Sequence, residues 1–108
     1  MARWVNVAAA DEFARDTVRV VDLDDGRQVA VFNVAGRYYA LEDMCSHEAE
    51  ALSWGAVEGG EVTCPRHGAR FSLASGAALS PPAYEPVATF AVRVENGMVQ
   101  VYDDGTRI

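Results

Sequence analysis

The sequence predicts an all-β fold in which strand-rich ends carry a loop-rich centre. Short runs of alternating apolar and polar residues occur at both ends of the chain, and turn signals separate them. Between Cys45 and Pro82 this periodicity fades, and glycine, proline and serine punctuate shorter segments. Half of the 108 residues are apolar, which is enough for one domain with its own core. A rigid scaffold that presents a functional insert is therefore expected.

The N-terminal part of the scaffold predicts three strands joined by tight turns. The runs rich in β-branched and aromatic residues are Val18–Val21, Gln28–Phe32 and Tyr38–Leu41. Asp24-Asp25-Gly26 separates the first two runs and Ala35-Gly36 the second two, so we expect a turn at each place. The pattern favours a helical turn only at Asp11–Arg15.

The C-terminal part predicts a hairpin. Phe90–Val94 and Met98–Tyr102 flank Asn96-Gly97. Asn-Gly between alternating apolar residues is the strongest short-range hairpin signal, because both turn positions of a type I′ turn need positive φ. These two runs complete the set of expected strands.

Charge and hydropathy narrow the classes of partner. The formal charge is −7, from 9 basic and 16 acidic residues, and phosphate binding needs a basic patch that is missing here. No apolar run approaches the roughly 20 residues of a membrane-spanning helix. The N-terminus also lacks the positive-then-apolar layout of a signal peptide. We therefore expect a cytoplasmic protein that binds neither nucleic acid nor membranes.

Both cysteines and both histidines of the chain lie in two short central motifs. These are Cys45-Ser46-His47 and Cys64-Pro65-Arg66-His67, with sixteen residues between them. A structural zinc site accepts two cysteines and two histidines. A [2Fe–2S] cluster with both thiolates on one iron and both imidazoles on the other accepts the same donors. A thiol enzyme with a histidine base would leave the second pair unused. The donor set alone leaves zinc and iron–sulfur open.

The residues around the second motif favour iron–sulfur. Gly68-Ala69-Arg70-Phe71 follows it directly, and Pro81-Pro82 comes later. This stretch resembles the Rieske [2Fe–2S] family, whose pattern is Cys-x-His, a spacer of this length, Cys-Pro-x-His-Gly-x-x-Phe and a later Pro-Pro. The resemblance covers roughly residues 29–102. It implies that Cys45, His47, Cys64 and His67 hold one [2Fe–2S] cluster. These four residues would then be both the metal ligands and the cofactor-binding site.

The same resemblance implies a Rieske-type fold. Its base would be an antiparallel β-sandwich formed from roughly residues 1–42 and 83–108. Its cluster-binding subdomain would be inserted at roughly residues 43–82. The base and the cluster-binding subdomain together would form one domain that spans residues 1–108.

Within the family the chain most resembles the ferredoxin components of bacterial ring-hydroxylating dioxygenases. This implies a diffusible, monomeric one-electron carrier between an NADH-dependent flavoprotein reductase and a terminal oxygenase, both docking transiently near His47 and His67. We expect it not to be an enzyme, because the implied cluster would use both histidines and leave none for an oxygenase iron. Two alternatives remain open: the small subunit of an assimilatory NADH nitrite reductase, and a ferredoxin of another oxidoreductase system.

Two positions near the second motif imply a low midpoint potential. High-potential relatives place a serine and a tyrosine just after the second histidine, where they donate hydrogen bonds to cluster sulfurs. This chain has Ala69 and Phe71 there, and neither side chain can donate. Hydrogen bonds to sulfur stabilise the reduced state, so we expect a potential near the about −150 mV end of the Rieske range.

Overall fold

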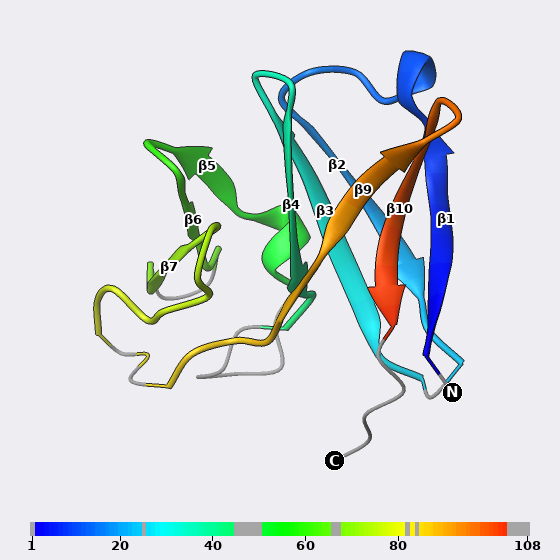
Figure 1. The fold of residues 1–108 in the computed structure, drawn as a ribbon. Helices are drawn as coiled ribbons and strands as arrows, with labels where there is room; N and C mark the ends of the chain where they lie inside the picture. The colour runs from blue at the N-terminus through cyan, green and yellow to red at the C-terminus, as the bar shows by residue number, and fades with distance from the viewer. Residues whose placement is uncertain are drawn as a thin grey trace.

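The computed structural model describes residues 2–24, 26–44, 51–65, 68–81, 83 and 85–103, and these form three antiparallel sheets (Figure 1). The first sheet has the order β1-β10-β9, with bounds Arg3–Ala9, Met98–Asp103 and Val92–Glu95. The second has the order β2-β3-β4-β8, with bounds Thr17–Asp22, Gln28–Val34, Arg37–Glu42 and Thr89–Phe90. The third has the order β5-β6-β7, with bounds Ala56–Glu58, Glu61–Thr63 and Arg70–Ser72. Two short 3₁₀ helices, η1 (Ala10–Glu12) and η2 (Leu52–Trp54), complete the described elements.

The all-β prediction is confirmed, with local corrections. The chain turns at Asn96 and Gly97 with φ of 52° and 77°, as a type I′ turn requires. The expected strand Phe90–Val94 is divided, because β8 pairs with β4 whereas β9 pairs with β10. The expected helical turn Asp11–Arg15 is wrong at its C-terminal end. The helix η1 stops at Glu12, and Phe13 enters the core with 3% of its surface exposed. No described helix is long and apolar enough to cross a membrane.

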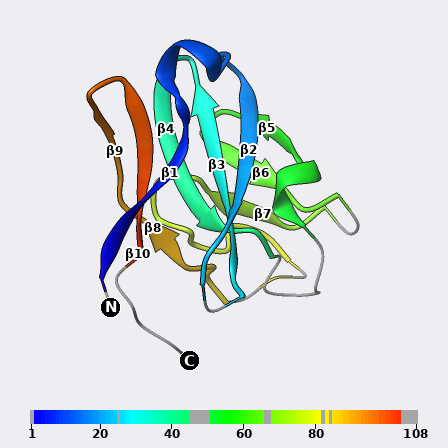
Figure 2. The ribbon, with the colours of Figure 1, turned by 90° about the vertical axis from the view of Figure 1, so that its right-hand side faces the viewer.

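The middle sheet β2-β3-β4-β8 lies between the other two, as two perpendicular views show (Figures 1 and 2). Its strand β3 is buried on both faces, since side chains alternate along a strand. Val29 and Val31 pack with Val99 and Val101 of β10 in the core of the two larger sheets. Ala30 and Phe32 face the opposite core, which contains Cys64. One strand therefore joins the scaffold to the region of the second motif.

The turn between β3 and β4 contains a strained residue that offers a stability test. Ala35 adopts φ 53°, where a side chain without a local hydrogen bond is disfavoured by about 1–2 kcal/mol, and Gly36 follows at φ 91°. Asparagine tolerates this region better, so Ala35→Asn should stabilise the fold by about 0.5–1 kcal/mol. For a domain of this size that raises Tm by about 2–8 °C in calorimetry. A Tm at or below that of the wild type would contradict the strain.

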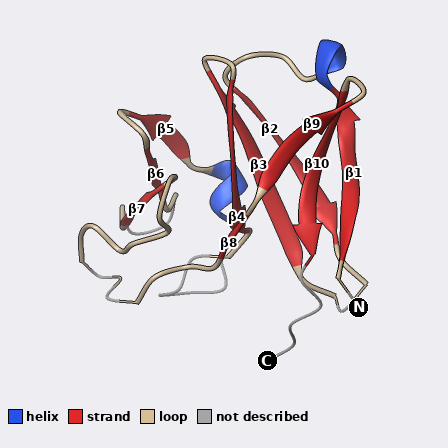
Figure 3. Ribbon diagram, in the orientation of Figure 1, coloured by secondary structure: helices blue, strands red, loops and turns tan. Residues whose placement is uncertain are grey.

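The third sheet and η2 form the second core. β5, β6 and β7 have three residues each, which explains why a period-two pattern is hard to read in this part of the sequence. Val62 of β6 and Phe71 of β7 share one core with Leu52 of η2 and with buried residues of β3 and β4. The helix η2 is the lower of the two blue helices in Figure 3, and it contacts β2. The central segment is thus ordered by its contacts with the scaffold rather than by its own periodicity.

Candidate metal centre

Cys64 is the predicted ligand that the described residues include; Cys45, His47 and His67 lie outside them. Cys64 follows β6 directly, and 1% of its surface is exposed. Its thiol is free of any disulfide. It shares a core with Phe71 of β7 and Leu52 of η2. The protein thus places an unoxidised, water-excluded thiol where the second motif begins.

Backbone hydrogen bonds join Cys64 to Gly68 and Ala69 at the end of the β6–β7 hairpin. The Cys64 N–H donates to the Ala69 carbonyl at 2.7 Å, and the Gly68 N–H donates to the Cys64 carbonyl at 3.0 Å. Gly68 has φ 77°, and a Cβ built on it would meet no atom within 4 Å. Glycine is therefore favoured here by the positive φ, and not by a lack of space for a side chain.

The residues on either side of the first motif are packed close to Cys64. Leu41 of β4 and Leu52 of η2 are fully buried in the core that contains Cys64. Gly55, at the end of η2, lies so close to Thr63 that a Cβ would collide with the Thr63 carbonyl oxygen. Thr63 is the residue before Cys64, so the end of the first motif's loop and the start of the second motif are in backbone contact.

The sequence analysis missed two polar side chains that bracket the first motif. Asp43 follows β4, and Ser53 lies in η2. The Asp43 carboxylate accepts hydrogen bonds from both the backbone N–H and the hydroxyl of Ser53. The only local signal is that Asp43 stands two residues before Cys45, at a strand end, which does not identify its partner.

The segment that leads to the proline pair is tied back to β7. The Arg70 N–H donates to the Ser80 hydroxyl oxygen at 3.0 Å, and the Leu79 N–H donates to the Arg70 carbonyl at 2.7 Å. Pro81 is exposed, and Pro82 lies outside the described residues. The chain is thus held beside the hairpin that carries Cys64.

The described residues fit a thiolate-bound metal cluster. A buried thiolate is unfavourable unless a cation compensates its charge, and iron would supply that charge at Cys64. Ala69 and Phe71 are both fully buried with Cys64 and bring no hydroxyl or carboxylate into this core. The described residues that share a core with Cys64 are therefore apolar.

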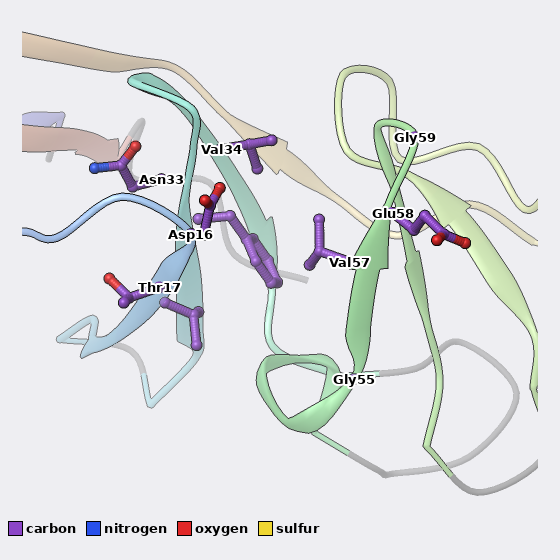
Figure 4. A pocket seen from close by; sticks show the side chains of 10 residues that line it. Asp16, Thr17, Asn33, Val34, Gly55, Val57, Glu58 and Gly59 are labelled. Atoms are coloured by element: carbon purple, nitrogen blue, oxygen red, sulfur yellow. The ribbon is translucent and has the colours of Figure 1, made fainter.

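The groove in Figure 4 lies away from this centre. It has a volume of about 290 Å³ and lies between the ends of β2 and β3 and the hairpin β5–β6. Two of its polar side chains already bind the chain itself. The Asn33 amide donates to the Phe13 carbonyl and accepts from the Gly36 N–H, and the Asp16 carboxylate accepts from the Ala35 N–H. Cys64 does not line it.

The chain is similar to one protein family and to several known proteins. The model of the Rieske [2Fe–2S] domain matches residues 3–91. The ferredoxin component of the naphthalene 1,2-dioxygenase/salicylate 5-hydroxylase systems of Ralstonia sp is 34% identical over 98 residues. That alignment covers 91% of this chain and 93% of the relative.

Two solved structures extend the comparison. A chain in the complex of reduced oxygenase and oxidised ferredoxin in carbazole 1,9a-dioxygenase is 36% identical, with a TM-score of 0.86 and 91% of each chain covered. A Mycobacterium tuberculosis protein assigned as an NADH-dependent nitrite reductase small subunit is 28% identical. Its TM-score is 0.81, over 95% of this chain and 96% of that chain.

Proposed function

The chain belongs to the Rieske [2Fe–2S] family, and we propose that it is a ferredoxin that carries single electrons from an NADH-dependent flavoprotein reductase to a terminal oxygenase of aromatic rings. The observation that carries the proposal is the likeness, over nine-tenths of both chains, to ferredoxin components of such systems. Like them, it is an electron carrier rather than an enzyme. Its cofactor is one [2Fe–2S] cluster.

The proposed ligands are Cys45 and Cys64 on one iron and His47 and His67 on the other. The burial of Cys64 in an apolar core and the backbone hydrogen bonds that it makes support the second pair. The backbone contact between Gly55 and Thr63 supports the convergence of the two loops. When bound, the cluster supplies a one-electron redox couple. The protein's part would be to place the sulfur donors, exclude water from Cys64 and leave the histidine edge accessible.

We expect both partners to dock at the end of the molecule that carries the two motifs, near His47 and His67. Three large apolar side chains adjoin the motifs or the proline segment and are exposed. Trp54 in η2 is 81% exposed, Met44 directly precedes Cys45, and Leu79 directly precedes Ser80. Interface centres are enriched in tryptophan and methionine. A shared, small docking face suits a monomeric carrier whose two complexes must be short-lived.

Trp54→Ala is expected to weaken docking without changing the redox couple. Truncating a central interface tryptophan costs about 2 kcal/mol or more, so Kd for a terminal oxygenase should rise at least about thirtyfold. The midpoint potential should stay at the wild-type value. Val94→Ala is the matched control, because Val94 is an exposed apolar residue on β9, in the sheet farthest from β5–β7 (Figure 1). Equal Kd values for the two variants would refute the docking face.

The nitrite reductase alternative is distinguished by reconstitution. The observation that supports this alternative is the structural similarity, with a TM-score of 0.81, to a protein assigned as such a small subunit. The proposed function predicts that the reduced protein transfers its electron rapidly to the oxygenase of carbazole 1,9a-dioxygenase or a similar ring-hydroxylating enzyme. It also predicts rapid reduction by a flavoprotein reductase with NADH. Stoichiometric, lasting binding to a sirohaem nitrite reductase subunit, with no reduction of any oxygenase, would favour the alternative.

A further inference from the structure

We propose that Asp43 and Ser53 form a clasp that fixes the two ends of the loop carrying Cys45 and His47, and so determines how firmly the cluster is held. The Asp43–Ser53 clasp is a positioning pair and not a ligand pair. The inference rests on the proposed function, because it concerns the retention of the same cluster.

The clasp is a paired contact through both oxygens of one carboxylate. Asp43 Oδ1 accepts from the Ser53 backbone N–H at 2.7 Å, and Oδ2 accepts from the Ser53 Oγ–H at 2.8 Å. Hydrogen bonds to an ionised carboxylate are about twice as strong as neutral ones, and a bidentate contact also fixes direction. Asp43 is 9% exposed, so water competes little for these bonds.

Each half of the clasp is anchored independently. The Asp43 N–H donates to the Gln28 carbonyl at 2.8 Å, and the preceding Glu42 N–H donates to the Ala88 carbonyl at 2.9 Å. Ser53 follows Leu52, which is fully buried in the core that contains Cys64. The clasp therefore joins two rigid points, and the loop between them loses the freedom of its ends before any metal binds.

The charge of Asp43 also argues for a role beyond stability. Within the part of the chain that the structure describes, Asp43 forms hydrogen bonds but no ion pair. Burying a carboxylate is unfavourable, and an apolar residue would fill the same space at a lower cost in folding free energy. Asp43 stands two residues before Cys45, at the start of the loop. Its carboxylate holds Ser53, at the end of the loop, by two hydrogen bonds at once.

Four variants separate the clasp from its charge. Asp43→Ala removes both bonds, and Ser53→Ala removes the hydroxyl bond and keeps the backbone bond. Ser53→Thr keeps the hydroxyl. Asp43→Asn keeps the geometry, because its amide oxygen accepts from the Ser53 N–H and its NH₂ donates to Oγ. Asp22→Ala is the matched control: Asp22 ends β2, is exposed, and accepts only from the Gln28 side chain among the described residues.

The test is the rate at which the oxidised holoprotein loses its visible absorbance in an iron chelator. Asp43→Ala should bleach about tenfold to a hundredfold faster than the wild type, which is the range for residues that orient metal ligands. Ser53→Ala should be intermediate, and Ser53→Thr, Asp43→Asn and Asp22→Ala should remain close to the wild type. The reduced Asp43→Ala protein should also show shifted g values in electron paramagnetic resonance, which a loss of global stability alone would not produce.

The outcomes distinguish the clasp from the proposed function. If Asp43→Ala and Ser53→Ala bleach no faster than Asp22→Ala, the clasp is overturned and the electron carrier stands. If Asp43→Ala fails to fold, the bleaching rates of Ser53→Ala and Ser53→Thr test the clasp instead. Only Ser53→Thr keeps the hydroxyl that donates to Asp43. A wild-type protein that holds no cluster at all would refute the proposed function.

Discussion

Cys64→Ala is expected to yield a colourless protein that retains no iron and no acid-labile sulfide. Cys64 supplies one of two proposed thiolates, and no other cysteine among the described residues can replace it. The thiol is buried with Phe71 and Leu52, so neither water nor an exogenous thiol reaches its place easily. Visible absorbance and iron analysis of freshly purified protein provide the measurement.

Val62→Ala controls for the damage that Cys64→Ala does to the core. Val62 lies two residues earlier, is fully buried and belongs to the same core. Its truncation opens a cavity in that core but leaves both proposed thiolates. Val62→Ala should unfold at a lower temperature and still be red-brown. If Cys64→Ala kept its colour and iron, the assignment of Cys64 as a ligand would be wrong.

Ala69→Ser is expected to raise the midpoint potential by on the order of 50 mV. Ala69 is opposite Cys64 at the end of the β6–β7 hairpin, where the Cys64 N–H donates to its carbonyl at 2.7 Å. Both side chains belong to one core, and directly opposite Cβ atoms in a sheet are about 5 Å apart. A serine hydroxyl there would lie within reach of the Cys64 sulfur or of a sulfur of the bound cluster. A hydrogen bond of about 1 kcal/mol that strengthens on reduction corresponds to a shift of that size for one electron.

Ala40→Ser is the matched control for this shift. Ala40 is also buried, but it faces the core between the two larger sheets, on the opposite face of the middle sheet. Its hydroxyl is remote from Cys64, so the midpoint potential should not move. Phe71→Tyr should raise the potential as well, because Phe71 packs in the Cys64 core. Unchanged potentials in both Ala69→Ser and Phe71→Tyr, measured by redox titration, would show that neither position faces a sulfur.

The features that the sequence predicts well are those with a local signal. Asn96-Gly97 fixes a hairpin through two positive φ values, and Gly68, which follows the second motif, also adopts a positive φ. Strand β1 was not predicted, because its pairing partner β10 is at the other end of the chain and no turn links them. The division between β8 and β9 depends in the same way on which sheet each half joins.

The candidate site shows the same limit. The residue types and spacing of the two motifs are local, so the four proposed ligands can be read from the sequence, although only Cys64 is among the described residues. The Asp43–Ser53 clasp depends on where η2 packs, and that is decided by the burial of Leu52 in a core built from several strands. The proposed boundary between base and insert, at residues 43 and 82, remains a prediction.

Electron paramagnetic resonance of the dithionite-reduced, freshly purified protein tests the central claim most directly. Two thiolates on one iron and two imidazoles on the other make the irons unequal. The account predicts a rhombic signal whose average g lies below the free-electron value, from a protein that is red-brown before reduction. A silent spectrum from colourless protein, with one zinc per chain or no metal, would contradict it.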